Sequence, residues 1–374
     1  MRKVNFQSTE DARAQARNRL PWMVFDYIDG AAGNEHGARR NRRAFERMAF
    51  ETAILQNVSE RSLAVSLGGK QAARPFGISP MGMCNLAAPG ADRMLARLAA
   101  RNNVPLGVST VASTPMEELI TVADGNAWFQ LYFSGDGEGT FRLVERARSA
   151  GYETLVLTVD VPEVGRRPRE LRHGFHMPFK IGPKQFLDFA MHPRWSLSTL
   201  AFGRPEMANF QMDGFSFDRT ESRARADWGT LSRLRDMWKG KLVVKGVLSV
   251  SDAVKLKNAG VDAIQVSSHG SRQLEAARSP VLALGDIRQA LGDSFPLYYD
   301  SGIRSGEDVL KAIASGADFT FLGRILLFAI AAGGEAGLQR IWEIVSAEAD
   351  IGLAQLGLAS IDRGSLAGRL ISEV

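Results

Sequence analysis

Cysteine is nearly absent from this chain of 374 residues, and histidine is scarce. The single cysteine, Cys84, excludes an intrachain disulfide and fits a reducing compartment such as the cytoplasm. Residues 1–20 lack the apolar segment of a secretory signal peptide. No run of about 18 apolar residues occurs, so we expect no helix that spans a bilayer. These absences together predict a cytoplasmic protein.

A strong charge of one sign is also lacking. The chain has 46 Lys and Arg against 41 Asp and Glu, and its net charge of +5 permits anionic partners without requiring them. Arginine-rich runs at 38–47 and 165–175 are typical of a solvated surface. We therefore expect no nucleic-acid partner. With 45% hydrophobic residues, the chain has enough apolar side chains to bury a large core.

Short apolar segments rich in β-forming residues alternate with amphipathic, helix-like segments along most of the chain. Eight such strands, each followed by a segment of helix length, predict an α/β fold of the (β/α)₈ or TIM barrel class. A doubly wound open sheet is the alternative, but that fold rarely needs eight evenly spaced units. The expected strands are 75–80, 105–110, 127–133, 154–160, 241–247, 262–268, 296–302 and 318–324.

Two segments fall outside this alternation, within what we take to be a single domain over residues 1–374. Residues 1–70 precede the first strand, and we predict that they form an N-terminal helical extension. Residues 170–228 form an insertion after the fourth strand that is much longer than a usual connection.

Polar and small residues stand where the predicted strands end. In a TIM barrel the active site lies at the carboxyl ends of the strands, which meet at one mouth. Turn formation accounts for serine, aspartate and glycine there, but not readily for lysine, histidine, glutamine and arginine on the same rim. We therefore expect an active site at this mouth. The residues at the strand ends are Pro80, Met81, Gly82, Ser109, Gln130, Tyr132, Thr158, Asp160, Lys245, Ser267, His269, Asp300, Gly323 and Arg324.

The loops after the seventh and eighth strands indicate a phosphate site. DSGIRSGEDV (300–309) places small residues before a helix, and LGR (322–324) places Gly323 beside a cation at the next helix start. Backbone N–H groups at the two helix starts, together with Arg304 or Arg324, can hold a dianion. Because these loops are the usual phosphate site of TIM barrels, we expect a phosphorylated ligand.

Lys245 stands inside VVKGV, an otherwise apolar strand. A buried lysine is unfavourable unless an anion pairs with it or it is neutral. Three interpretations follow: an ammonium that reaches the barrel rim, a cation that meets negative charge on a cofactor, or a neutral amine that forms a Schiff base.

The motif SSHGSRQL at 267–274 resembles a signature of the FMN-dependent L-2-hydroxy acid oxidases and dehydrogenases, the family of glycolate oxidase, L-lactate dehydrogenase and (S)-mandelate dehydrogenase. The resemblance extends from about residue 25 to 357 and is greatest to the mandelate dehydrogenase branch. Supporting segments are FDYIDGAAG (25–33), FQLYF (129–133), LTVDVPEVGRRPRELR (157–172), LVVKGV (242–247) and DSGIRSGEDVLKA (300–312).

This resemblance implies the catalytic and substrate-binding residues. His269 matches the active-site base, Asp160 its hydrogen-bonding partner, and Tyr132 lies near the substrate hydroxyl. A base with a pKa near neutrality suits the oxidation of a 2-hydroxy acid, which releases a proton. The substrate carboxylate is expected to bind Tyr27, Arg167 and Arg272, since a guanidinium binds a carboxylate through two hydrogen bonds. Arg166 is the alternative to Arg167.

The resemblance also implies FMN as the cofactor and no metal. Pro80, Met81 and Gly82 match residues that offer backbone to the flavin ring. A fixed cation at Lys245 stabilises the charge that reduced flavin acquires. The other implied FMN contacts are Ser109, Gln130 and Thr158 at the polar ring edges, Ser267, Asp300 at the ribityl chain, and Gly302, Arg304, Gly323 and Arg324 around the phosphate.

The chain departs from the family pattern at several positions. The family usually has Asn at Ser268, Gly or Ala at Ser271, and Asp at Glu275. Ser305 replaces a common second arginine in the phosphate loop, which weakens or rearranges the grip on the phosphate.

Two further positions favour a dehydrogenase over an oxidase. Oxidase members often have Ala at Gly82 and Trp at Val111. Small residues there leave room for a substrate side chain such as phenyl. We therefore expect an (S)-2-hydroxy acid like mandelate as the substrate, with L-lactate or an oxidase that uses O₂ as the alternatives.

The insertion suggests partners beyond the substrate. Residues 176–210 mix apolar with basic side chains, as interfacial membrane segments do. We expect a peripheral protein on the inner face of the cell membrane that passes electrons to a quinone or another acceptor. An active-site lid or a subunit contact is the alternative role. The resemblance also implies a homotetramer.

Three other classes remain open from the sequence. A flavin-dependent isomerase explains Lys245 and the phosphate loops, but not His269, Arg272 and Arg167 together. A Schiff-base aldolase would use Lys245 as its nucleophile. A non-catalytic membrane-bound scaffold is the third.

Overall fold

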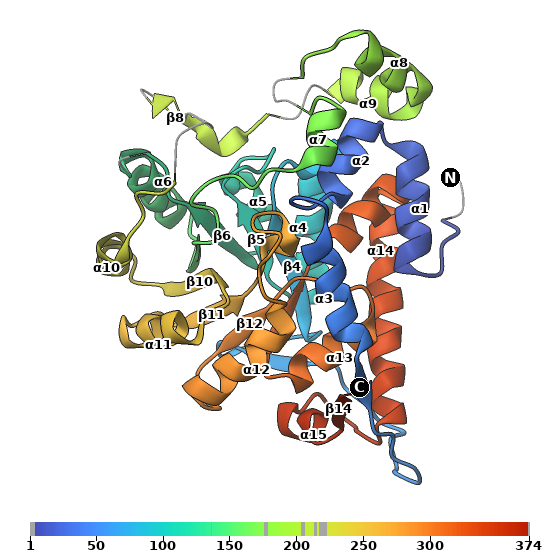
Figure 1. Ribbon diagram of the computed structural model, residues 1–374, viewed down its shortest axis with the longest axis vertical. Coiled ribbons are helices and arrows are strands. Elements are labelled where there is room, and N and C mark those ends of the chain that lie inside the picture. Colours follow the sequence, from blue (N-terminus) through green and yellow to red (C-terminus); the bar gives the residue numbers. More distant parts are fainter. Residues whose placement is uncertain are drawn as a thin grey trace.

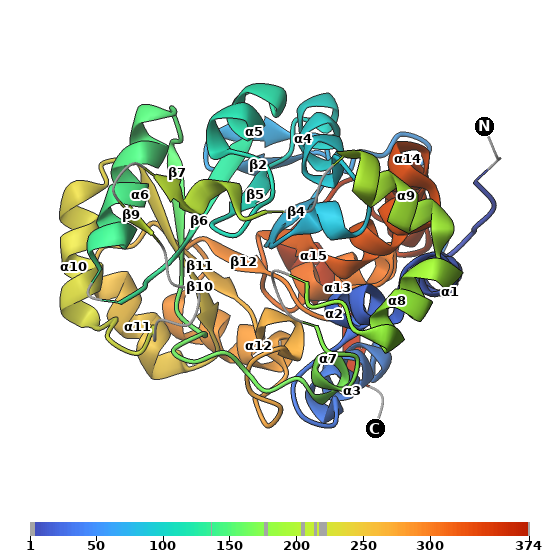
Figure 2. The same cartoon turned by 90° about the horizontal axis from the view of Figure 1, so that it is seen from above.

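The carboxyl ends of eight parallel strands face one side of the molecule in the computed structural model, which describes residues 4–135, 137–175, 179–202, 206–212, 215–216 and 223–372 (Figures 1 and 2). The strands form one closed barrel, because β7 pairs with β10 across the insertion and β13 pairs with β4. Closure confirms the TIM barrel and excludes the open sheet. The strands are β4 (Phe76–Met81), β5 (Leu106–Ser109), β6 (Ala127–Tyr132), β7 (Thr154–Thr158), β10 (Lys241–Val247), β11 (Ala263–Val266), β12 (Leu297–Tyr299) and β13 (Phe319–Leu322).

Helices cover the outside of the barrel, as Figure 2 shows from above. Their starts follow ordinary capping chemistry. Ser249 and Asp227 stand at the N-caps of α11 (Val250–Asn258) and α10 (Trp228–Met237), where each side chain accepts a backbone N–H from the first turn. The other barrel helices are α4 (Ala91–Asn102), α5 (Met116–Val122), α6 (Glu138–Ser149), α12 (Pro280–Leu291), α13 (Gly306–Ala314) and α14 (Arg324–Gln355).

Aromatic side chains fill the centre of the barrel. The rings of Trp128, Tyr298 and Phe321 pack together, with centroids 5.4–6.1 Å apart. Phe321 lines the pocket at the carboxyl ends of the strands, whereas Trp128 and Tyr298 line a cavity at the opposite end. The interior is therefore a packed core that supports the pocket from below.

The N-terminal extension is helical over less of its length than residues 1–70. Its helices are α1 (Thr9–Arg19), α2 (Trp22–Asp29) and α3 (His36–Glu46). Beyond them the prediction is wrong, because β1 (Met48–Phe50) pairs with β14 (Leu370–Ser372), which follows α15 (Arg363–Ala367), and β2 (Val65–Leu67) forms a hairpin with β3 (Lys70–Ala72). Gly68 and Gly69 have φ of +57° and +87°, which a two-residue hairpin turn requires.

The insertion holds α7 (Pro168–Arg172), α8 (Pro183–Met191), α9 (Pro193–Phe202), a short helix η2 (Ala208–Phe210), β8 (Gln211–Met212) and β9 (Phe215–Ser216). In Figure 1, α8 and α9 stand above the barrel near α1 and α2. The indole N–H of Trp195 donates to the carbonyl of Leu86, and the backbone N–H of Trp22 donates to Asp188. Parts of the predicted membrane segment, 176–178 and 203–205, lie outside the described residues.

Gly306→Ala tests the close packing of α13 on α14. A Cβ at Gly306 would lie 2.2 Å from the backbone N of Ala349 and 2.4 Å from the carbonyl of Val345, so the helices must separate. We expect the free energy of unfolding to fall by about 1–3 kcal/mol in urea titrations. Gly229→Ala is the control, because Gly229 lies exposed in α10 and alanine there should stabilise by about 0.5–1 kcal/mol. An unchanged stability of Gly306→Ala would contradict this packing.

Candidate active site

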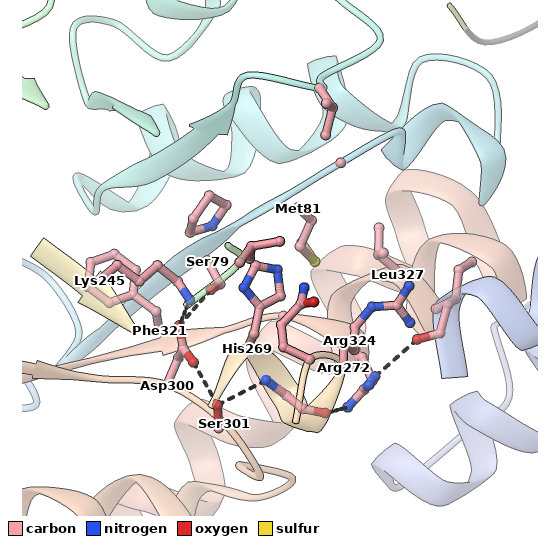
Figure 3. Close-up of a pocket in the computed structure, with 18 of the residues that line it drawn as sticks. Ser79, Met81, Lys245, His269, Arg272, Asp300, Ser301, Phe321, Arg324 and Leu327 are labelled. Atoms are coloured by element: carbon pink, nitrogen blue, oxygen red, sulfur yellow. Dashed lines mark hydrogen bonds and ion pairs between the residues drawn. The ribbon is translucent and has the colours of Figure 1, made fainter. Parts of the chain in front are cut away.

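A pocket opens at the mouth of the barrel, where the sequence places the strand ends. It encloses about 1350 Å³ of space, part of it open to solvent. Figure 3 shows Lys245 and Asp300 on one side of His269, and Arg272 and Arg324 on the other. The predicted residues that line the pocket are Tyr27, Pro80, Met81, Gly82, Tyr132, Arg167, Lys245, His269, Arg272, Asp300, Gly302, Arg304, Gly323 and Arg324.

His269 follows β11 and points into the pocket between two partners. Its Nδ1 lies 3.0 Å from a carboxylate oxygen of Asp160, and its Nε2 lies 3.3 Å from the hydroxyl of Tyr132. Because the carboxylate accepts a hydrogen bond, we assign the proton of the neutral ring to Nδ1, which leaves Nε2 as the base. Burial and the charge of Asp160 raise the pKa of Tyr132, so its hydroxyl stays protonated.

The two candidate carboxylate-binding arginines lie on either side of one buried acid. Glu170, at the start of α7, accepts from Nη2 of Arg272 at 2.8 Å and lies 3.2 Å from Nε of Arg167. Arg272 also lies over the ring of Tyr27, whose hydroxyl donates to the carbonyl of Gly82 at 3.2 Å. Arg167 lines the pocket, as predicted. Glu170 was missed, because nothing in the sequence distinguishes it from a surface acid of a short helix.

Lys245 is buried with its charge paired. Its ammonium donates to the hydroxyl of Ser267 at 2.8 Å and lies 3.0 Å from a carboxylate oxygen of Asp300. Burial alone would raise the pKa of Asp300, but the charge of Lys245 and the hydrogen bonds of Ser267 and Ser301 outweigh it, and the pKa is lowered. The pairing favours a charged lysine over the neutral amine that a Schiff-base mechanism needs.

Polar groups lie at or near the carboxyl ends of three neighbouring strands, β5, β6 and β7. The hydroxyl of Ser109 donates to Oε1 of Gln130 at 3.0 Å. Nε2 of Gln130 and the hydroxyl of Thr158 are buried and have no hydrogen-bond partner in the described part of the chain. Such groups are unfavourable unless a ligand satisfies them. A flat heteroaromatic ring with donors and acceptors on its edge, such as isoalloxazine, fits this set together with Lys245.

The phosphate loops hold more positive charge than their acids neutralise. Burial, followed by the charges of Arg272 and Arg304, lowers the pKa of Arg324 to about 9. Burial and the charge of Arg42 lower the pKa of Arg304 to about 10. Both shifts mean that an anion would stabilise this region, which fits a phosphate. Ser305 is the N-cap of α13 and accepts the backbone N–H of Asp308, which gives this departure from the family pattern a structural role.

Sequence reasoning missed several residues of this site. Ser301 accepts backbone N–H groups of Ser268 and Gly270, and Arg223 lies over the ring of Tyr132 at 4.8 Å. Ser301 could have been predicted, because it directly follows the predicted residue Asp300. Arg223 could not, because it lies near the end of the insertion, where no motif marks it. Predicted residues that lie behind the pocket surface are Ser109, Gln130, Thr158, Asp160 and Ser267.

A TIM barrel whose mouth holds a histidine paired with an aspartate, two arginines that share a glutamate, and unsatisfied polar groups beside a buried lysine fits a flavin-dependent oxidoreductase. The sequence profile of the family described as FMN-dependent dehydrogenase matches residues 16–367. (S)-Mandelate dehydrogenase of Pseudomonas putida is 38% identical over 365 residues, covering 96% of this chain and 92% of that protein. L-lactate dehydrogenase of Pectobacterium atrosepticum is 35% identical over 364 residues, covering 95% of this chain and 94% of that protein.

Solved structures agree with these relatives. The crystal structure of the monotopic membrane protein (S)-mandelate dehydrogenase matches with a TM-score of 0.94 and 38% identity, covering 99% of this chain and 100% of that one. Mandelate oxidase with (S)-4-hydroxymandelic acid matches with a TM-score of 0.85 and 32% identity, covering 99% of this chain and 100% of that one. The chain belongs to the FMN-dependent dehydrogenase family. It is an FMN-dependent 2-hydroxy acid dehydrogenase.

Gly82→Ala tests whether the close contact between positions 82 and 111 leaves room for the substrate side chain. A Cβ at Gly82 would lie 2.4 Å from Cγ2 of Val111 and 3.5 Å from the hydroxyl of Tyr27, so Val111 must move into the pocket or away from it. We expect kcat/KM for a hydroxy acid with a large side chain to fall about tenfold. Gly82→Ala/Val111→Ala should recover most of that loss, and Val111→Ala alone serves as the control. If the double variant is as impaired as Gly82→Ala, contact with Val111 is not the cause.

Proposed function

We propose that this enzyme oxidises an (S)-2-hydroxy acid similar to mandelate to the 2-oxo acid. One observation carries the proposal: the Nε2 side of His269, backed by Asp160, faces the same pocket as Arg167 and Arg272. A base and a carboxylate-binding pair at one pocket suit a substrate whose hydroxyl and carboxylate are on adjacent carbons.

Each side chain then has a defined task. Arg167, Arg272 and the hydroxyl of Tyr27 bind the carboxylate and fix the orientation of the substrate. His269 removes a proton through Nε2, and the carboxylate of Asp160 stabilises the imidazolium that results. Bound FMN supplies the two-electron acceptor, held by Gln130, Thr158 and Lys245 at its ring and by the loops around Arg304 and Arg324 at its phosphate.

The apolar part of the pocket lining supports a substrate with a large apolar side chain. It includes Val111, Val161, Val164 and Met207, and Gly82 adds no side chain of its own. L-lactate is the second candidate substrate, because the relatives include L-lactate dehydrogenases.

We further propose that α8 and α9 bind the inner face of the cell membrane, from which a quinone or a similar acceptor takes the electrons. In the described part of the chain, no helix is both long and apolar enough to cross a bilayer. The exposed apolar side chains of the two helices suit an interfacial contact instead, and the similar (S)-mandelate dehydrogenase is a monotopic membrane protein. These side chains are Phe186, Leu187, Met191, Leu197, Leu200 and Phe202. A homotetramer, implied by the resemblance, stays a prediction.

His269→Ala tests the base. We expect anaerobic reduction of the flavin by (S)-mandelate to slow by about 10³-fold, because general-base catalysis is lost. The visible flavin spectrum of the oxidised protein should persist, since FMN is held mainly by other side chains. Reduction at near the wild-type rate would overturn the role of His269 as base. A colourless wild-type protein that takes up no FMN would overturn the whole proposal.

Substitution of Leu197, Leu200 and Phe202 by Asp tests the membrane contact. These side chains are exposed in α9, and charges there should abolish co-sedimentation with phospholipid vesicles. Turnover with a soluble dye acceptor should stay within about twofold of wild type, because α9 contributes no residue to the pocket. The same change at Ile54 and Leu55, which are exposed far from α9 in sequence, is the control and should leave vesicle binding intact. Vesicle binding by the α9 variant would refute the assignment.

A further inference from the structure

The turn that carries His269 has an unfavourable backbone. His269, Gly270 and Ser271 have φ of +55°, +62° and +61°, respectively. The left-handed region favours glycine, but only the central residue of this turn is one. A strained conformation of this kind persists only where its surroundings impose it. The geometry of His269 therefore depends on whatever holds the turn.

One set of restraints comes from the neighbouring barrel strand. The hydroxyl of Ser301, after β12, accepts the backbone N–H groups of Ser268 at 3.2 Å and Gly270 at 3.1 Å. Ser301 itself donates to Asp300 at 2.8 Å, so this side of the turn is tied to the buried pair of Asp300 and Lys245. Figure 3 shows this connection.

A second set comes from α3, in the N-terminal extension. Nδ2 of Asn41 donates to the hydroxyls of Ser268 and Ser271, both at 2.9 Å. These two serines are immediately before and two residues after His269. Asn41 is 2% exposed, so water does not compete for its amide. Both hydrogens of one amide group thus hold the two ends of the strained turn.

The packing of α3 makes this contact possible. Gly37 is one helical turn before Asn41, and a Cβ there would lie 3.1 Å from Cβ of Ser271 and 2.7 Å from the carbonyl of Glu275. The carboxylate of Glu275 accepts the backbone N–H groups of Asn34 and His36 at the start of α3. The motif departs from the family pattern at three residues, and each of them contacts α3 or the residues just before it. These are Ser268, Ser271 and Glu275.

We propose that Asn41 is a positioning residue for His269, acting through the hydroxyls of Ser268 and Ser271. The proposal rests on the proposed function, in which His269 is the base. Asn41 does not line the pocket, so it acts on His269 only through the turn. It fixes the turn so that Nδ1 of the imidazole stays 3.0 Å from Asp160 and Nε2 faces the substrate hydroxyl.

The test compares Asn41→Ala, Ser271→Ala and the double variant, each as FMN-loaded protein. We expect each single variant to lower kcat for (S)-mandelate by roughly tenfold, while KM changes less than twofold and FMN content is unchanged. The double variant should be no slower than Asn41→Ala, because both substitutions break the same hydrogen bond. Additive losses, or losses confined to KM or FMN content, would overturn the proposal.

Ser271→Gly keeps the test decisive if Asn41→Ala does not fold. Glycine relieves the left-handed backbone at this position, so thermal stability should not fall. The hydroxyl is nevertheless lost, and kcat should fall as in Ser271→Ala. Wild-type kcat in Ser271→Gly or Ser271→Ala would overturn the proposal.

Two reference variants separate this proposal from the proposed function. Ser279 lies in the same loop as Ser271, and its buried hydroxyl has no hydrogen-bond partner among the described residues. Ser279→Ala should therefore leave kcat unchanged. A comparable loss in Ser279→Ala would overturn the specific role of Asn41. His269→Ala should lose nearly all activity, and if it is active the proposed function fails. If His269→Ala is inactive while Asn41→Ala is fully active, only the positioning role of Asn41 is refuted.

Discussion

Parallel strands that close into a barrel all have their carboxyl ends at the same mouth, because after each strand the chain returns to the other end of the barrel along its outside. In this protein that constraint brings the ends of β4, β5, β6, β7, β10, β11, β12 and β13 around a single pocket, although these strands are spread over the sequence. The positions of Lys245, His269 and Asp300 at one pocket depend on this closure. The aromatic packing of Trp128, Tyr298 and Phe321 below the pocket supports the same arrangement from inside the barrel.

Charge balance organises the pocket once the strand ends have met. Lys245 is paired with Asp300, His269 with Asp160, and Arg167 and Arg272 share Glu170. A buried charge without a partner is unfavourable, so each of these pairs allows a reactive or binding group to remain inside the protein. The loops after β12 and β13 are different, because burial and neighbouring arginines lower the pKa of Arg304 and of Arg324, and the phosphate of the cofactor is the proposed partner of this positive charge.

The N-terminal extension and the segment after β7 contribute residues to the site as well as covering the barrel. Tyr27 of α2 and Arg167, which directly precedes α7, line the pocket, whereas Asn41 of α3 holds the turn of His269 from behind. Tyr27 and Arg167 could be predicted, because they fall within motifs that resemble a known family. Asn41 and Glu170 could not, because their importance lies in which side chains they touch across the fold. An asparagine in an arginine-rich helix looks like a surface residue until the helix is placed against the turn of His269.

The sequence by itself determined the alternation of strands and helices, the polar residues at the strand ends and the histidine motif. These are local properties, since hydrophobic periodicity and turn chemistry act over a few residues. Only the tertiary structure decided that residues 48–50 and 370–372 pair as strands, that Lys245 is ion-paired, and that the side-chain amide of Asn41 in α3 holds both ends of the turn of His269. The reason is physical: these pairings of strands, ions and buried hydrogen-bonding groups join residues that are distant in sequence, and their partners are known only when the chain has folded.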